Sequence, residues 1–179
     1  MRAERRKTEK LNNAGYSLVE MVIVIAILAL LVGTVVYSVI MVFSANAKTT
    51  ANNIQRAIAD CKVTTMGRSA AYMELYRDAS DQNVYTRMYV WDNSAGDYAP
   101  AEPQKVGTSR VYVAYKPKNG IETELTAGDK IKITFDRASG GFTDDGSGNI
   151  YVKLHVVGGS KDYDIVLTEL TGKSEVKVN

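Results

Sequence analysis

The sequence has little cysteine and little histidine, with one residue of each among its 179. A single cysteine forms no disulfide within the chain, so packing alone must stabilise any part that lies outside the cell. A single histidine excludes metal sites built from several histidines and leaves only His155 as the base of a Ser/His/Asp triad. No serine or cysteine stands at a recognisable spacing from it. The composition therefore favours a protein that is not an enzyme and needs no cofactor or metal.

The sequence also lacks a strong excess of charge of either sign, with 22 Lys and Arg against 20 Asp and Glu. This balance excludes both a disordered acidic chain and a strongly basic nucleic-acid binder. The one uneven region is the N-terminus, where residues 1–10 hold five basic and two acidic residues. Basic residues elsewhere are dispersed, so nothing in their pattern indicates binding to nucleic acid.

One long apolar run stands out, since residues 21–43 contain 23 consecutive residues without a charge. As a helix this run is about 35 Å long, which matches the roughly 30 Å hydrocarbon core of a membrane. The sequence therefore predicts a transmembrane helix over residues 21–43. Because the basic cluster precedes it, we expect the N-terminus in the cytoplasm and residues 44–179 outside the cytoplasmic membrane.

Two other interpretations of the apolar run remain open. Residues 44–47 offer a small-residue signal-peptidase site, which would release a secreted protein that begins at Lys48, although signal sequences have apolar regions of only about 7–15 residues. An uncleaved anchor for a binding or adhesion domain is the second interpretation. It leaves Glu20 unexplained, because a carboxylate at the edge of an apolar membrane helix costs on the order of 1–3 kcal/mol.

The segment GYSLVE, from Gly15 to Glu20, lies between the basic leader and the apolar run. It resembles the processing site of type IV prepilins and type II secretion pseudopilins, in which a glycine ends a short basic leader and a glutamate is the fifth mature residue. The resemblance implies that prepilin peptidase cuts after Gly15 and methylates the new N-terminus at Tyr16. Tyr16 stands where the family usually has Phe, and the aromatic ring is retained.

Elementary electrostatics agrees with this resemblance. A cut after Gly15 creates an ammonium group on Tyr16, and residues four apart lie on one helix face, so Glu20 would gain a cation. The partner is either the amine of the same chain or that of a neighbouring subunit in a helix bundle. Because an unpaired charge in an apolar bundle is strongly penalised, such a pair would set the axial register. Ala29 and Gly33 form a small-xxx-small pair, which is a weak indication of close helix packing.

The helical pattern continues beyond the apolar run. Residues Ala47, Ala51, Ile54, Ile58 and Cys61 recur at helical spacing, with polar residues between them. We therefore predict one helix over residues 16–67, transmembrane over 21–43 and amphipathic over 44–67, which ends near Gly67. Cys61 lies on the apolar stripe and is predicted to be a buried small hydrophobe.

The remaining residues, 68–179, predict an extracytoplasmic domain of antiparallel strands. The clearest alternation is that of Ile131, Ile133 and Phe135. Glycine turns near residues 140, 159 and 172 indicate hairpins, and residues 92–109, with two prolines, predict a long loop. The expected fold class is α+β, a long helix on a small sheet domain, as in pilins. The predicted strands are 72–77, 84–91, 110–116, 130–136, 150–157, 163–169 and 175–178.

Two weaker candidate sites lie in this domain. Asp144, Asp145 and Asn149 form an acidic loop, and some pseudopilins bind calcium in a surface loop, but the spacing lacks the distal glutamate of an EF-hand and favours a solvated turn. His155 alternates with the apolar residues of its strand, which predicts a surface position. Trp91 is predicted to lie in the core or in a cross-strand aromatic pair.

Taken together, these observations and the resemblance predict a structural subunit, similar to minor pseudopilins, of a type IV pilus, a type II secretion pseudopilus or a competence pilus. Its expected partners are prepilin peptidase, the cytoplasmic membrane and other pilin subunits in a periplasmic or extracellular filament. Nucleic acid would be a partner only in a competence pilus.

Overall fold

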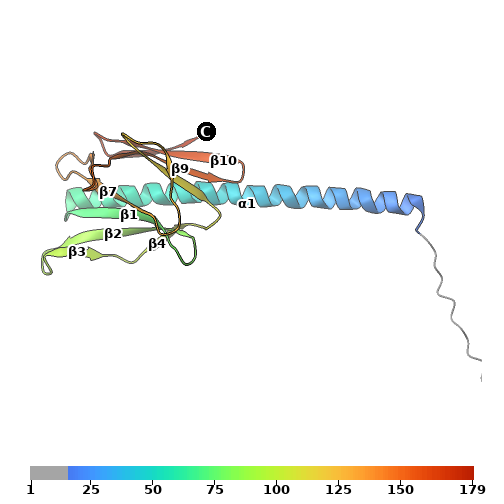
Figure 1. The fold of residues 1–179 in the computed structure, drawn as a ribbon, viewed down its shortest axis with the longest axis horizontal. Helices are drawn as coiled ribbons and strands as arrows, with labels where there is room; N and C mark the ends of the chain where they lie inside the picture. Colours follow the sequence, from blue (N-terminus) through green and yellow to red (C-terminus); the bar gives the residue numbers. More distant parts are fainter. Residues whose placement is uncertain (1–15) are drawn as a thin grey trace, which may run out of the picture. The chain divides into compact units, whose positions relative to one another are not determined.

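The computed structural model describes residues 16–179, so the leader with Gly15 lies outside the described residues. The chain divides into two compact units between Tyr37 and Ser38. Helix α1, Leu18–Gly67, begins in the first unit and ends in the second (Figure 1). The long helix predicted from the sequence is therefore confirmed, although it starts two residues later than Tyr16.

The described part of the first unit is the apolar half of α1. Its side chains from Leu18 to Tyr37 are all exposed. Among residues 16–179, α1 is the one helix long and apolar enough to cross a membrane. An apolar helix exposed all round has its partners outside its own chain.

In the second unit, the amphipathic half of α1 packs on two antiparallel sheets. Asn53 Nδ2 donates to Val106 O on one sheet, and Gln55 Nε2 donates to Ser174 O on the other. The predicted apolar stripe forms the contact, as expected from its helical spacing. All its residues are fully buried: Ala47, Ala51, Ile54, Ile58 and Cys61.

The first sheet has six strands in the order β3-β2-β1-β7-β8, with β4 also paired to β2 (Figure 1). Its core face carries alternate residues, such as Met73 and Leu75 of β1 and Ile131 and Ile133 of β7. The strands are β1 Ala71–Arg77, β2 Val84–Asp92, β3 Asp97–Pro100, β4 Gln104–Gly107, β7 Lys130–Phe135 and β8 Phe142–Thr143.

The second sheet has five strands in the order β11-β10-β9-β5-β6. Its fully buried apolar residues include Val113 of β5, Leu154 and Val156 of β9 and Ile165 of β10. The core is therefore a single apolar cluster shared by α1 and both sheets. The strands are β5 Tyr112–Pro117, β6 Thr123–Glu124, β9 Tyr151–Gly158, β10 Lys161–Thr168 and β11 Lys173–Val178.

The turn between β9 and β10 lies directly on the backbone of α1. A Cβ at Gly158 would lie 2.7 Å from Phe43 O, and one at Gly159 would lie 2.5 Å from Ile40 O. Gly159 also has a φ of 65°, a conformation that favours glycine. Ser160 N–H donates to Ser44 Oγ at 3.2 Å. This turn therefore packs against the last residues of the apolar run and against Ser44, which follows it.

Every strand predicted from the sequence is present, but two predictions were wrong. Residues 92–109 hold β3 and β4 instead of one long loop, because the nine-residue strand β2 offers an edge to both. The alternation of Ile150, Val152, Leu154 and Val156 predicts a buried Val152 and an outward Tyr151, but in β9 Tyr151 is buried and Val152 is only half-buried. The neighbouring strand β5 has a register shift between Lys116 and Pro117, which interrupts the regular pairing at this end.

Candidate functional site at the start of helix α1

Helix α1 begins with a side-chain cap that the sequence reasoning missed. Ser17 Oγ accepts a hydrogen bond from Glu20 N–H at 3.1 Å, and Ser17 O accepts one from Met21 N–H at 3.1 Å. Serine at the N-cap followed by glutamate three residues later is the capping-box spacing. That spacing was visible in the sequence, within the GYSLVE segment. The motif therefore also defines where the helix starts.

Glu20 lies in the first turn of α1. The positive end of the helix dipole stabilises a carboxylate there by about 0.3–1 kcal/mol. This is a second, local reason for an acid at position 20. It is smaller than the cost of about 1–3 kcal/mol for a carboxylate at the edge of a membrane helix, so a cation is still needed for full compensation.

Tyr16 lies immediately before the N-cap and its side chain is 76% exposed. It is not helical, so the helical four-residue spacing between Tyr16 and Glu20 is absent from the uncut chain. The backbone nitrogen of Tyr16 nevertheless lies at the end of the helix that carries Glu20. A new amine at this nitrogen would lie at the same end of α1 as the carboxylate.

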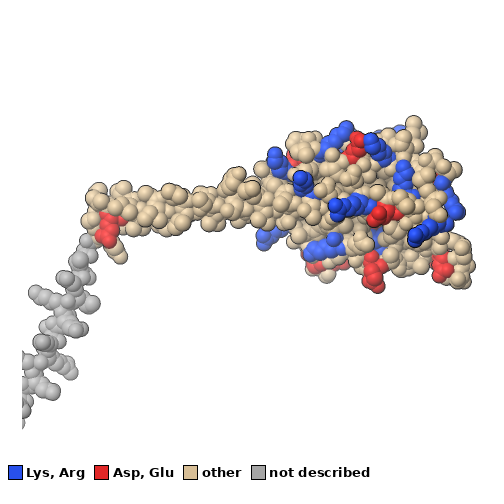
Figure 2. Space-filling view, turned by 180° about the vertical axis from the view of Figure 1, so that it is seen from behind, with Lys and Arg blue, Asp and Glu red and all other residues tan. Residues whose placement is uncertain are grey.

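Beyond Glu20, the helix surface carries no charged side chain over residues 21–43. Figure 2 shows this stretch as an unbroken surface without Lys, Arg, Asp or Glu. Ala29 and Gly33 are four residues apart on it, and a Cβ at Gly33 would meet nothing within 4 Å. The small pair therefore leaves room on one face for another helix to approach closely.

Residues 10–36 match the protein family described as the prokaryotic N-terminal methylation motif. This match supports a type IV prepilin-like or pseudopilin-like protein. The motif implies that prepilin peptidase processes this prepilin-like chain and that it assembles with other pilin subunits. It also indicates a structural protein with a membrane anchor. Comparison with curated proteins and with solved structures gives no match.

The acidic loop between β8 and β9 uses its carboxylates internally. Asp144 Oδ1 accepts from Gly148 N–H at 3.0 Å, and Asp145 Oδ1 accepts from Ser147 N–H at 2.7 Å. Burial raises the pKa of Asp145, but hydrogen bonds from the loop outweigh it and hold that pKa below its ordinary value. Among residues 16–179 no three Asp, Glu, His or Cys side chains are placed to hold a metal ion. The calcium hypothesis for Asp144, Asp145 and Asn149 thus gains no support.

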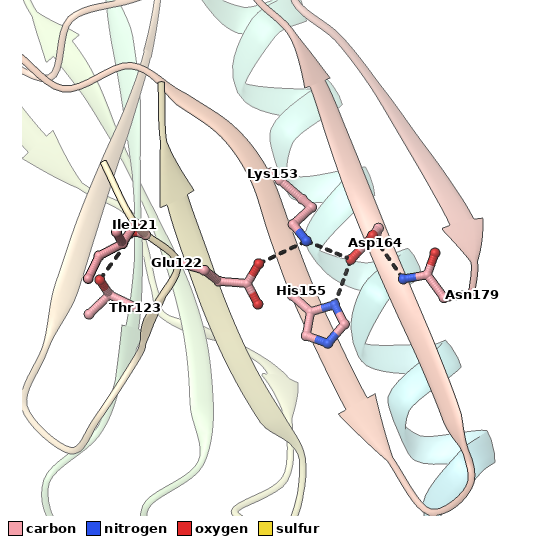
Figure 3. A network of polar contacts seen from close by, with 7 residues as sticks. All are labelled: Ile121, Glu122, Thr123, Lys153, His155, Asp164 and Asn179. Carbon is pink, nitrogen blue, oxygen red and sulfur yellow. Dashed lines mark hydrogen bonds and ion pairs between the residues drawn. The ribbon is translucent and has the colours of Figure 1, made fainter. Parts of the chain in front are cut away.

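His155 lies on the outer face of β9, as predicted, and is half-buried there. Its Nδ1 lies 2.6 Å from Asp164 Oδ1, and Lys153 Nζ lies 3.6 Å from the same oxygen (Figure 3). Lys153 also pairs with Glu122 at 2.8 Å, and Asn179 Nδ2 donates to Asp164 Oδ2. The network joins β9, β10, the segment before β6 and the C-terminus. Its role is to hold these elements together on the outer face of the second sheet.

Two further predictions can be compared with the structure. Cys61 is fully buried, and burial raises the pKa of its thiol to about 12 against a smaller lowering by the hydrogen bond with Thr65. The prediction of a buried cysteine is confirmed. Trp91 pairs across strands with Tyr98, ring centroids 5.2 Å apart, which confirms the aromatic-pair alternative.

Proposed function

We propose that this chain is a filament subunit that prepilin peptidase cuts after Gly15 and methylates at Tyr16. The mature helix then leaves the membrane and bundles with the helices of other subunits, while the sheet domain lies on the outside. The chain performs no catalysis in this function. The observation that carries the proposal is a capped helix with an exposed apolar surface whose first residues lie within the methylation motif at residues 10–36.

The exposed helix needs two apolar environments in succession. Before assembly, lipid covers residues 21–43, since burial of apolar surface gives roughly 25 cal/mol per Å². In the filament, neighbouring helices replace the lipid, and Ala29 with Gly33 supplies a close-packed face. The helix exchanges one apolar partner for another, so extraction from the membrane loses little hydrophobic free energy.

Glu20 is proposed to select the assembled position of the helix. The amine of Tyr16, on the same or a neighbouring subunit, compensates its carboxylate. A helix shifted along the filament axis leaves both charges unpaired in apolar surroundings, a penalty of several kcal/mol. The pair therefore acts mainly through register, and the helix dipole adds a smaller local stabilisation.

The fold argues against the secreted alternative. A cut after Ala47 would remove Ser44, Phe43 and Ala47 from contact with the β9–β10 turn, although Ala47 is fully buried in the domain. The loss of a helical turn from the core destabilises the domain. An uncleaved anchor with a binding domain is compatible with the fold and remains the alternative to be tested.

We propose that the filament belongs to one of three systems: a type IV pilus, a type II secretion pseudopilus or a competence pilus. All three use a processed helix of this kind. We propose a minor subunit, with a cytoplasmic N-terminus before processing and an extracytoplasmic sheet domain.

The experiment is a Glu20→Val variant expressed together with the wild-type chain and the prepilin peptidase of its host. We expect the leader to be removed and the chain to stay in the membrane, while its incorporation into filaments falls at least about tenfold through the loss of the ion pair. Glu102→Val is the matched control, because Glu102 is an exposed acid of the sheet domain. Incorporation of Glu20→Val at the wild-type level would contradict the register role.

A further inference from the structure

An open pocket of about 330 Å³ lies in the second unit where β1 ends and β5 begins. Its lining includes two arginines, Arg77 and Arg110, with Tyr112 and Glu124. Arg77 is only 6% exposed, whereas Arg110 is exposed at the rim. The pocket thus combines one buried and one accessible guanidinium group.

Arg77 is held by backbone carbonyls. Its Nε donates to Leu125 O, its Nη1 to Gln82 O and its Nη2 to Val111 O, each at 2.8 Å. These bonds take three of the five guanidinium N–H donors. Within residues 16–179 no ion pair involves Arg77. All three acceptors are neutral carbonyls, and the carboxylate whose charge acts on Arg77 is Glu124, which lines the same pocket.

One residue of the pocket lining also contacts Phe43, within the second unit. The guanidinium carbon of Arg110 lies 5.4 Å from the ring centroid of Phe43, the last residue of that run. Tyr112 is 40% exposed beside it. On the face seen in Figure 2, Lys and Arg side chains lie near the place where α1 emerges from the sheets. Tyrosine, arginine and lysine are the residues that proteins place at the level of lipid headgroups.

The charges in the pocket lining favour a singly charged anion. Arg77 and Arg110 contribute two positive charges and Glu124 one negative charge, which leaves a net charge of +1. A phosphodiester carries one negative charge and accepts hydrogen bonds from arginine in bidentate geometry. Phospholipid headgroups contain this group, and they lie at the depth that Phe43 defines when residues 21–43 span the membrane.

We propose that this pocket binds the phosphodiester of an anionic membrane lipid, with Arg77 at its base and Arg110 at its rim. The inference rests on the proposed membrane span. Bound lipid orients the sheet domain on the membrane surface before assembly, and release of the lipid accompanies extraction into the filament.

The test is a titration of the full-length chain, in a non-ionic detergent, with dihexanoyl phosphatidylglycerol, with bound lipid measured by native mass spectrometry. Arg110→Gln is expected to weaken binding at least about fivefold, because it removes a charge-assisted contact at the rim. Glu124→Gln is expected to strengthen binding about two- to fivefold, because it removes a repulsive charge. Lys116→Gln, an exposed cation further along β5, is the matched control and should bind as the wild type does.

Equal binding by Arg110→Gln, Glu124→Gln and the wild type would overturn the proposal. Inorganic phosphate at millimolar concentration is added as a competitor of the lipid. If it displaces the lipid, and if its own binding depends on Arg110 and Glu124 in the same way, the pocket is a site for free phosphate and the lipid proposal is overturned. Membrane fractionation of the same variants separates this inference from the proposed function. A chain that stays in the membrane but binds no phosphatidylglycerol contradicts the pocket alone, whereas a chain absent from the membrane contradicts both.

Discussion

The two halves of helix α1 differ in what covers their apolar side chains. From Leu18 to Tyr37 every side chain is exposed, whereas further along the helix a stripe from Ala47 to Cys61 is fully buried under two sheets. The first half is apolar all round and the second is apolar on one face only. A single helix thus obtains part of its stability from its own domain, and the rest must come from lipid or from other subunits.

Within this one helix, the buried half therefore contributes to folding of the domain and the exposed half to membrane insertion and assembly. Substitutions in the buried stripe should change the stability of the domain and leave processing intact. Substitutions in the exposed half should change membrane insertion or assembly and leave the domain folded. Each prediction below tests one side of that division, in order of decreasing effect.

The largest expected effect is on thiol reactivity. Cys61 is buried and its pKa is raised to about 12. At pH 8 we expect a chromogenic disulfide reagent to react with it roughly a thousandfold more slowly than with an exposed thiol, because little thiolate forms. The matched control is Val63→Cys in a Cys61→Ala background, since Val63 is 70% exposed two residues away. Similar rates at both positions would show that the second half of α1 is not held against the sheets.

Truncation of Ile54 should give the next largest effect. Ile54 is fully buried, so Ile54→Ala is expected to lower the free energy of unfolding by about 2–5 kcal/mol. Ile25→Ala, in the exposed half, should change it by less than about 0.5 kcal/mol. The measurement is urea unfolding of the full-length chain in detergent, followed by Trp91 fluorescence. An equal loss for both variants would remove the distinction between the halves.

The β9–β10 turn allows a finer test of how the domain holds α1. Gly159→Ala should lower the free energy of unfolding by roughly 2–3 kcal/mol, because it combines an unfavourable φ with a clash against Ile40 O. Gly96→Ala has a similar φ of 69° but open space around the Cβ, so we expect a loss of only about 1 kcal/mol. Equal losses would mean that the turn does not press on the helix.

The smallest effect concerns surface charge. Burial raises the pKa of Asp164, but hydrogen bonds from Asn179 and His155 and the charge of Lys153 outweigh it and lower that pKa below 3.8. A lowered pKa contributes stability above the unfolded value, and that stability is lost as the pH falls below about 4.

We expect Asp164→Asn to remove less than about 1 kcal/mol of unfolding free energy at neutral pH and to flatten the acid limb of the stability curve. Asp162→Asn on the same strand is the control. If the stability of the Asp164→Asn variant still falls steeply at acid pH, other carboxylates and not Asp164 cause that loss of stability.

The sequence predicted the elements whose patterns are long and regular. The stripe from Ala47 to Cys61 and the alternation of Ile131, Ile133 and Phe135 each repeat several times, so burial follows directly from the period. Strands β3, β4, β6 and β8 have two to four residues and no such repeat. These short strands form because a neighbouring strand offers an edge to pair with. Their own residues carry no pattern that predicts this pairing.

The candidate site was predictable in part for the same reason. The order of glycine, aromatic residue, glutamate and apolar run is local, so the sequence alone identified it. Ser17 was overlooked although its capping spacing is local as well. The pairing of His155 with Asp164 and the pocket around Arg77 depend on strands distant in sequence, and no local pattern indicates them.

The most direct test of the account is the N-terminus of the chain recovered from filaments, determined by intact mass and N-terminal sequencing. We predict a chain that begins with N-methylated Tyr16 and lacks residues 1–15. A functional chain that still begins at Met1 would contradict processing and favour an uncleaved anchor, and one that begins at Lys48 would favour a secreted domain.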